Sequence, residues 1–276
     1  MRKLILLLIG ICLLSACSFA QSADEAAALG DRYFFGEGVE KDAGKAFACY
    51  MEAAEAGNLH AISYIGYMYY NGLGVEQDYA KSFEWQSKAA DAGDTNAMSA
   101  IGAMLLGGVG TVQDTDQALA WFTLAADAGN VDSMRMIGQM YYFAQGVEQN
   151  YDKAFEWYSK AVDAGDALSM EMLGSFYYFG YSVEQDYTKT FEWTRKAADA
   201  GSVSAMNNLG ALYENGEGVE KDYDKAFEWY ATAAELGNAD AMYSLGHMYE
   251  QGLGTKQDAV SAADWYRKAR EAGYSD

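Results

Sequence analysis

Glycine at a fixed interval is the feature that most constrains this chain. Two series of seven glycines recur every 36 residues without an insertion: Gly30, Gly66, Gly102, Gly138, Gly174, Gly210 and Gly246, and Gly57, Gly93, Gly129, Gly165, Gly201, Gly237 and Gly273. Self-similarity at a period of 20 to 50 residues is the mark of a solenoid, propeller or other array. We therefore expect one repeat array over residues 21–276, with units at 22–57, 58–93, 94–129, 130–165, 166–201, 202–237 and 238–273.

Other residue types follow the same period. Paired glycines stand six and eight residues after the first series, and Ala144 and Ser182 each replace one glycine of a pair. In all, 26 of the 29 glycines lie on these lines, and the chain has no proline. The six tryptophans share one line, on which Cys49 stands in the first unit: Trp85, Trp121, Trp157, Trp193, Trp229 and Trp265. Such regularity predicts a repeated supersecondary unit whose turns are made by glycine.

One unit is interpreted as two helices joined by short turns. Asn58 can cap a helix whose apolar face has the three-and-four spacing of Ile62, Ile65, Met68 and Tyr69. That helix should end near Gly72, and Asp78 is the next candidate cap. A second amphipathic helix follows, with its inner face on Ser82, Trp85, Gln86, Ala89 and Ala90. Two helices of about 14 residues fill the period.

The small residues predict close helix packing. Glycine in mid-helix, as at Gly66, costs about 0.5–1 kcal/mol relative to alanine. Seven such glycines in register indicate that another helix backbone crosses at that point, and the alanine pair Ala89-Ala90 keeps the second helix equally close. The tryptophan line is expected to fill core volume.

The sixth unit carries a known family pattern almost letter by letter. Its matching residues are Ala205, Leu209, Gly210, Tyr213, Gly216, Gly218, Val219, Asp222, Lys225, Ala226, Trp229, Ala233, Ala234 and Gly237. They resemble the Sel-1-like repeat, a relative of the tetratricopeptide repeat, and the resemblance extends from Ser22 to Gly273. It implies an all-α fold, a right-handed α/α superhelix (solenoid) of seven 36-residue helix-turn-helix repeats. It also implies binding of other proteins or peptides on the concave side, which first helices line.

Residues 1–20 fall outside the repeat and are expected to form a secretory signal and short tether. Arg2 and Lys3 precede the apolar run Leu4–Leu14, which is too short to span a bilayer as a helix of about 20 residues. The run leads to Leu14-Ser15-Ala16-Cys17, which resembles a lipobox and makes Cys17 the predicted lipidation site. Cleavage before Gln21 is the alternative. We expect a periplasmic protein or an outer-membrane lipoprotein, or one released outside the cell.

Charge and motifs argue against several functions. The formal charge of −21 argues against nucleic acid, whose phosphates require a basic surface. His60 and His247 lie about five units apart, and the chain has no zincin, nucleophile-elbow, phosphate-loop or calcium-loop motif. Hydrolysis of β-lactams has been suggested for cysteine-rich members of the family, but their paired cysteines are missing here. We predict a non-catalytic chain with no cofactor and no bound metal.

A stripe of variable residues on the first helices is the predicted partner site. Positions that differ between units are free of the demands of the fold, and three such lines are spaced by four and three residues, as on one helix face. Units two, four and five place aromatic residues there, which are typical interface anchors. The predicted partner-binding residues are Tyr67, Tyr70, Arg135, Gln139, Tyr142, Phe143, Glu171, Tyr178 and Phe179. Packing of these rings on loops or on neighbouring units is the alternative.

These observations favour a monomeric scaffold that binds a partner protein or peptide in the groove of the superhelix, with membrane attachment only through the N-terminal lipid. A regulatory module for an envelope signalling protein is a second possibility, and a β-lactamase-like hydrolase a third.

Overall fold

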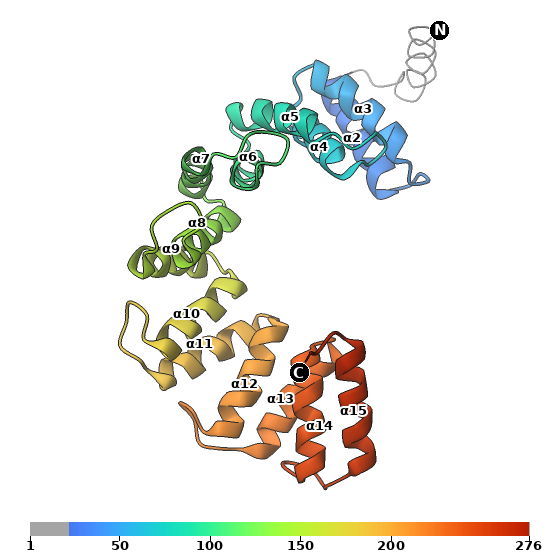
Figure 1. Cartoon of the computed structure of the whole chain (residues 1–276). Helices are drawn as coiled ribbons and strands as arrows, with labels where there is room; N and C mark the ends of the chain where they lie inside the picture. Colours follow the sequence, from blue (N-terminus) through green and yellow to red (C-terminus); the bar gives the residue numbers. More distant parts are fainter. Residues whose placement is uncertain (1–21, 276) are drawn as a thin grey trace. The chain divides into compact units, whose positions relative to one another are not determined.

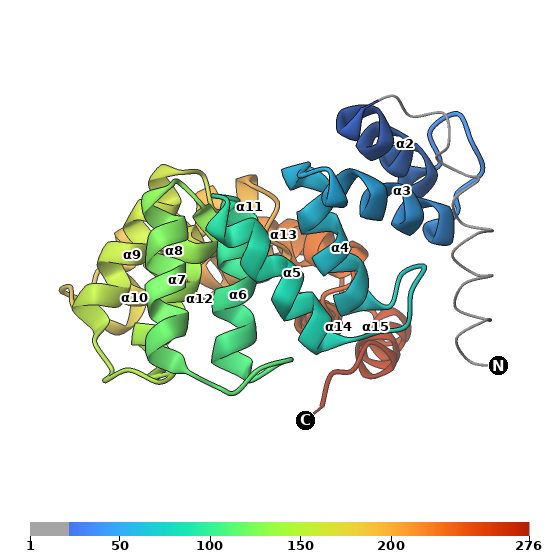
Figure 2. The same cartoon turned by 90° about the horizontal axis from the view of Figure 1, so that it is seen from above.

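The computed structural model describes residues 22–275, and Cys17 with the predicted signal segment lies outside them. The described chain contains fourteen α-helices of 13 residues each and no strand (Figures 1 and 2). The helices are α2 (Ala23–Phe35), α3 (Ala43–Glu55), α4 (Leu59–Asn71), α5 (Tyr79–Asp91), α6 (Thr95–Gly107), α7 (Thr115–Asp127), α8 (Val131–Phe143), α9 (Tyr151–Asp163), α10 (Ala167–Phe179), α11 (Tyr187–Asp199), α12 (Val203–Asn215), α13 (Tyr223–Glu235), α14 (Ala239–Gln251) and α15 (Ala259–Glu271). The all-α prediction of two helices per repeat is confirmed.

The ends of these helices are set by the residues that the sequence singles out. The side chain of Asn58 accepts a hydrogen bond from the backbone N–H of Ala61 at 2.9 Å, and Asp78 accepts one from Lys81 at 3.0 Å. Gly72, in the left-handed region at φ 67°, ends α4 by donating its amide to the carbonyl of Met68. Ser182 takes the same kind of backbone, at φ 60°, although it carries a side chain. The loop therefore keeps its conformation where glycine is lost.

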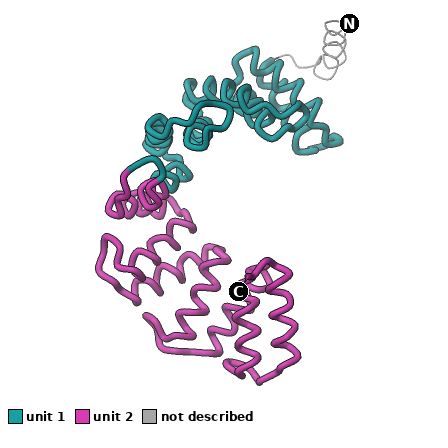
Figure 3. The backbone as a smooth tube through the Cα atoms, in the orientation of Figure 1, with its two compact units in different colours: residues 1–137, 145–147 teal, residues 138–144, 148–276 magenta. Residues whose placement is uncertain are grey.

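The described chain divides into two compact units (Figure 3). The first runs to Ile137 and includes Gln145–Val147, and the second comprises Gly138–Ala144 and the chain from Glu148 onward. Inside each unit the second helix of one repeat packs against the first helix of the next: α3 with α4 and α5 with α6, then α9 with α10, α11 with α12 and α13 with α14. The two helices of a repeat also lie side by side, as α6 and α7 or α14 and α15 show in both views.

The cores between these helices combine small and large apolar residues. In the first unit Ala53, Ile65 and Met68 are fully buried, and in the second unit Leu209 and Ala233 are fully buried. The tryptophans pack on the rim of these cores and remain half-exposed. A lysine three residues later covers the outer face of several of them, at 3.8 Å from Lys160 Nζ to the ring centroid of Trp157. The tryptophan line therefore covers the core rather than filling its centre.

Each mid-helix glycine makes room for a side chain of the second helix, which is an aromatic ring in five of the seven repeats. If Gly210 carried a β-carbon, that atom would lie 2.7 Å from the ring of Tyr230, and at Gly102 it would lie 2.8 Å from the ring of Phe122. The expectation of a crossing helix backbone is wrong, because a side chain of the second helix enters this space. The residue concerned directly follows the tryptophan line, and we call it the glycine-facing position: Tyr50, Gln86, Phe122, Tyr158, Thr194, Tyr230 and Tyr266.

None of the helices within residues 22–275 has both the length and the apolar character needed to cross a membrane.

Candidate functional site

The predicted partner-binding rings are exposed to different degrees. Tyr67 and Tyr70 of α4 are 48% and 40% exposed, whereas Phe143 of α8 and Phe179 of α10 are 56% and 57% exposed. Tyr142 and Tyr178 are half-buried. The structure places Tyr67, Tyr70 and Arg135 in the first unit and the other six predicted residues in the second, so each group is described by itself.

In the second unit the rings of repeats four and five belong to an aromatic cluster. Tyr142 contacts Phe143 at a centroid distance of 4.7 Å and Tyr151 at 5.4 Å. Tyr181 stacks on Tyr151 at 4.5 Å and on Phe179 at 5.3 Å. The structure thus brings Tyr142, Phe143 and Phe179 into one cluster through Tyr181. Part of each ring is used in packing, as the alternative interpretation states, while Phe143 and Phe179 keep a large open face.

Repeat two has a separate aromatic group. Tyr70 contacts Tyr79 at 5.1 Å, and Tyr67 lies 6.3 Å from Phe34 and 6.4 Å from Tyr64. Tyr67 and Tyr70 therefore each have aromatic neighbours in the first unit.

Two of the three polar residues of the prediction, Arg135 and Glu171, are engaged with neighbours. Arg135 forms an ion pair with Asp132 at 2.6 Å, and Gln139 is half-buried. Glu171 accepts hydrogen bonds from Ser202 Oγ at 2.9 Å and Ser204 Oγ at 2.6 Å, and a weaker one from Asn208 Nδ2 at 3.5 Å. All three donors to Glu171 are neutral, so its negative charge is oriented but not neutralised.

The glycine-facing position separates two kinds of repeat. Five repeats place a tyrosine or phenylalanine there, and repeats two and five place Gln86 and Thr194. One helical turn earlier the same five repeats have alanine, whereas repeats two and five have Ser82 and Thr190. Repeats two and five therefore have polar residues at both positions, where the other repeats have an alanine and an aromatic ring.

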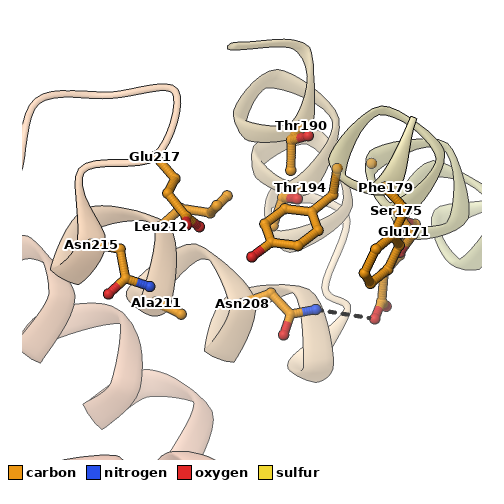
Figure 4. Close-up of a pocket in the computed structure, with 12 residues that line it drawn as sticks. Glu171, Ser175, Phe179, Thr190, Thr194, Asn208, Ala211, Leu212, Asn215 and Glu217 are labelled. Atoms are coloured by element: carbon orange, nitrogen blue, oxygen red, sulfur yellow. Dashed lines mark hydrogen bonds between the residues drawn. The ribbon is translucent and has the colours of Figure 1, made fainter. Parts of the chain in front are cut away.

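A recess lies beside Thr194 in the second unit, which we call the Thr194 recess (Figure 4). It has a volume of about 260 Å³ and is lined by Glu171, Gly174, Ser175, Tyr178, Phe179, Thr190, Thr194, Asn208, Ala211, Leu212, Asn215 and Glu217. Glu171 comes from α10, whereas Glu217 follows the end of α12, and Figure 4 shows Thr194 and Leu212 between them. Three of the predicted partner-binding residues, Glu171, Tyr178 and Phe179, line this recess.

A second recess lies beside Gln86 in the first unit, which we call the Gln86 recess. It consists of two adjoining hollows of about 450 and 280 Å³ that share Tyr67, Gln86 and Ala100. Tyr70 lines the smaller hollow. Gln86 is only 8% exposed, its Nε2 reaches the carbonyl of Ser63 at 3.4 Å, and its buried Oε1 has no partner among the described residues. A buried carbonyl oxygen without a donor is rare in native proteins, so this atom is suited to a donor brought by a ligand.

Three of the four tyrosines at the glycine-facing position donate a hydrogen bond to a carboxylate. Tyr50 donates to Asp31 at 2.6 Å, Tyr230 to Glu214 at 2.8 Å and Tyr266 to Glu250 at 3.1 Å. Burial and these carboxylates raise the pKa of Tyr50 and Tyr230 far above the usual value and that of Tyr266 to about 12. Repeat five has no such hydroxyl. There, burial and then the charge of Glu217 raise the pKa of Tyr178.

Sequence reasoning missed Gln86, Thr194 and Glu217. The signal was present in the chain itself, because Ser82 with Gln86 and Thr190 with Thr194 depart together from the alanine-plus-ring pattern of the other repeats.

No cluster of three or more potential metal ligands occurs among residues 22–275. His60 pairs with Asp31 at 2.8 Å, and His247 lies 3.9 Å from Glu214. The site residues described above can offer shape, rings and negative charge to a ligand.

Equal helical hairpins stacked on one another define a helical-repeat solenoid. The Sel1 repeat pattern matches seven segments, at residues 26–58, 59–94, 95–130, 131–166, 167–202, 203–238 and 239–274. The chain belongs to the Sel1 repeat family.

Solved structures agree with this assignment. The chain is 36% identical to c5321, a protective antigen of uropathogenic Escherichia coli strains with an SLR fold, at a TM-score of 0.83. That match covers 91% of this chain and 54% of the antigen, so the chain spans about half of the antigen's length. A Sel1 repeat protein from Oxalobacter formigenes is 32% identical at a TM-score of 0.82, with 89% of this chain and 99% of that one covered. No curated protein matches the chain.

The likeness also extends to the wider class of helical repeats. Yeast Tom70 matches at a TM-score of 0.56 with 13% identity, over 92% of this chain and 52% of that one, which is a likeness of fold alone. Sel1 repeat proteins generally act as protein-interaction scaffolds, and the fold is typical of non-catalytic proteins.

Proposed function

We propose that this chain is a non-catalytic scaffold that binds a partner protein or peptide through the first-helix side of its repeats. The observation that carries the proposal is the pair of phenylalanines Phe143 and Phe179, which lie more than half exposed beside half-buried tyrosines. The fold gains little from a ring in this state, because most of its surface stays in water. Aromatic residues that are held by neighbours and still open to solvent are suited to anchor a partner.

The two recesses support the same proposal. Both lie on the first-helix side next to exposed rings, Phe179 at the Thr194 recess and Tyr67 at the Gln86 recess. Their volumes, of about 260 to 450 Å³, suit one or two side chains of a peptide. Interfaces gain most of their affinity from a few anchors seated in such hollows.

A cross-linking experiment identifies the partner and tests its position. A photoreactive phenylalanine analogue replaces Phe179 in cells, and the control carries it at Glu228, which is exposed on the second helix α13. Mass spectrometry identifies the protein joined at each position. We expect one partner to cross-link at Phe179 and not at Glu228.

The identified partner is then purified and its affinity measured. Phe143→Ala and Phe179→Ala should each weaken binding by about fivefold or more, the loss of an anchor worth at least about 1 kcal/mol. Leu236→Ala is the matched control, because Leu236 is 58% exposed and follows the second helix α13. Equal effects at Leu236 and Phe179, or none at either phenylalanine, would contradict the proposed site.

We also propose that the protein is secreted and anchored by lipid at Cys17. The proposal rests on the order of basic residues, apolar run and lipobox-like tetrapeptide before Cys17, which lies outside the described residues. The mass of the mature protein from the membrane fraction tests it. A lipid-modified N-terminal cysteine supports the anchor, whereas a lipid-free chain that begins at Gln21 rules it out.

A further inference from the structure

The Thr194 recess is open because repeat five lacks a ring. In repeat six, Tyr230 fills the space against Gly210, with ring atoms 2.7 Å from the place of a β-carbon. In repeat five the nearest atom to the corresponding point on Gly174 is Thr194 Oγ1, at 3.1 Å, and Thr194 is too short to extend further. The chain itself therefore leaves unfilled a space that it fills with a side chain elsewhere.

The recess carries negative charge without a cation. Glu171 and Glu217 both line it, and none of its twelve lining residues is lysine, arginine or histidine. Neither carboxylate takes part in an ion pair within residues 22–275. Glu171 is instead oriented by Ser202, Ser204 and Asn208, all neutral donors. A positive charge entering the recess would meet two carboxylates that neutral groups contact but no cation of the recess neutralises.

The walls of the recess suit an aliphatic stem that ends in a cation. Tyr178 and Phe179 lie against one another at a centroid distance of 5.0 Å, and Leu212 supplies apolar surface. Aromatic faces attract ammonium and guanidinium groups, and long basic side chains pack their methylene groups on apolar surface. The volume of about 260 Å³ is below the range of roughly 300–1,000 Å³ for drug-sized ligands, and fits one side chain.

We propose that the Thr194 recess binds a lysine or arginine side chain of the partner, with its cationic group attracted by the carboxylates of Glu171 and Glu217 and its stem against Tyr178, Phe179 and Leu212. The inference rests on the proposed function, since it names the chemistry of one anchor of the bound segment. The acidic character of the whole chain, with a formal charge of −21, favours the approach of such a partner over the whole surface.

Short peptides test the recess without the natural partner. The probes are the acetylated, amidated pentapeptides Gly-Gly-Arg-Gly-Gly and Gly-Gly-Lys-Gly-Gly, and the controls replace arginine by citrulline and lysine by norleucine. These controls keep the stem and remove the charge. We titrate each peptide into the isotope-labelled protein and follow the backbone amide signals by NMR. Both basic peptides should shift signals around Glu171, Thr194 and Glu217, and both neutral peptides should bind at least about fivefold more weakly.

Two variants place the binding in the recess. Thr194→Tyr introduces the residue that repeats four and six carry at this position, and should abolish the shifts. Glu217→Gln keeps the shape and should weaken binding about threefold to fivefold, the range for one partly exposed ion pair. Glu235→Gln, on an exposed position of α13, is the matched charge control and should leave binding unchanged.

The outcomes separate this inference from the proposed function. Citrulline binding within twofold of arginine, or equal losses from Glu217→Gln and Glu235→Gln, would overturn the cationic occupant. Such a result leaves the cross-linking at Phe179 untouched. Conversely, a scaffold that cross-links nowhere on the first-helix side while the recess still binds arginine refutes the proposed function and keeps the recess.

Discussion

Repeats five and six differ at two buried positions one helical turn apart, Thr190 and Thr194 in repeat five and Ala226 and Tyr230 in repeat six. Repeat six places Tyr230 against Gly210, and the tyrosine hydroxyl donates to Glu214 at 2.8 Å. Repeat five places Thr194 against Gly174, and Glu171 and Glu217 remain beside open space. The same helical frame is thus closed in one repeat and open in the next. A repeat array can therefore gain a recess by losing a ring while its helices keep the same length.

Repeat two also lacks the ring, but its recess is lined by different polar groups from those of repeat five. Gln86 also replaces the ring, but its stem approaches Gly66 closely, with Cγ 2.9 Å from the place of a β-carbon. Its recess includes Asp94, whose carboxylate already accepts hydrogen bonds from the amides of Asn96 and Ala97 and from Ser63 Oγ. The Gln86 recess therefore combines one carboxylate and the histidine His60 with a neutral acceptor, whereas the Thr194 recess has two carboxylates and no basic residue.

Substitution of the mid-helix glycines should distinguish repeats five and six most strongly. In Gly210→Ala the new methyl would lie 2.7 Å from the rigid ring of Tyr230, whereas in Gly174→Ala it would lie 3.1 Å from Thr194 Oγ1. Overpacking costs about 1–3 kcal/mol, and alanine recovers about 1 kcal/mol of helix propensity. We expect Gly210→Ala to lower the free energy of unfolding by about 2 kcal/mol and Gly174→Ala to change it by less than about 0.5 kcal/mol. Urea unfolding of both variants measures this, and equal losses would mean that the two repeats are equally filled.

The sequence predicts the frame of the fold well, for local reasons. The caps at Asn58 and Asp78 and the end at Gly72 lie where the structure has them, because each follows from hydrogen bonding or backbone conformation within one turn. The depth of a side chain does not follow in this way. Trp85 and Gln86 both lie on the inner face of the same helix, and only the placement of the partner helix decides that Gln86 is the one buried against Gly66.

The candidate site could be predicted only in part for the same reason. Glu171 and Tyr178 are predicted because they lie on variable lines, and Phe179 because its ring lies at the rim of that stripe; all three line the Thr194 recess. Glu217 comes from a loop of the next repeat, so its part in the recess depends on packing between hairpins. Thr194 stands on a buried line, where variation signals a lost core residue rather than a free surface.

Removal of the buried Gln86 Oε1 should have the next largest effect on the free energy of unfolding. Gln86→Met keeps the length of the side chain and removes an Oε1 that has no partner among the described residues. An unsatisfied buried polar group costs about 1–3 kcal/mol, although the hydrogen bond from Nε2 to Ser63 is lost as well. We expect the free energy of unfolding to rise by about 1 kcal/mol. Gln251→Met is the control at an exposed position of α14 and should have little effect, and a loss of stability in Gln86→Met would show that the oxygen is satisfied.

Thr194→Tyr should then convert repeat five to the closed kind. Repeat four already combines Tyr158 at this position with Tyr142 at the position of Tyr178, so the larger side chain has a precedent in the same chain. Filling a cavity typically stabilises a protein by about 0.5–2 kcal/mol, and we expect the lower end because the recess is open to water on one side. Thermal unfolding measures the change. Destabilisation by more than about 1 kcal/mol would show that the recess cannot hold a ring and that the two repeats differ in backbone as well.

The smallest effect concerns acid and the caps of the second helices. Asp222 begins α13 by accepting the amide of Lys225 at 3.0 Å, and this hydrogen bond, with the Lys225 side chain, lowers the pKa of Asp222 below its ordinary value. A lowered pKa means that the cap stabilises the helix above about pH 4 and that this contribution disappears as the pH falls through the folded pKa of Asp222.

Asn150 caps α9 in the same geometry, accepting the amide of Lys153 at 2.9 Å, and does not titrate in this range. Hydrogen exchange, corrected for its intrinsic pH dependence, should therefore show that the amides of α13 lose protection as the pH falls below about 4 while those of α9 do not. Asp222→Asn should remove the difference and Asn150→Asp should create it in α9. Equal pH profiles in the two wild-type helices would contradict this prediction. They would mean that the charge of Asp222 adds nothing to its cap, which would then act like the uncharged Asn150 cap of α9.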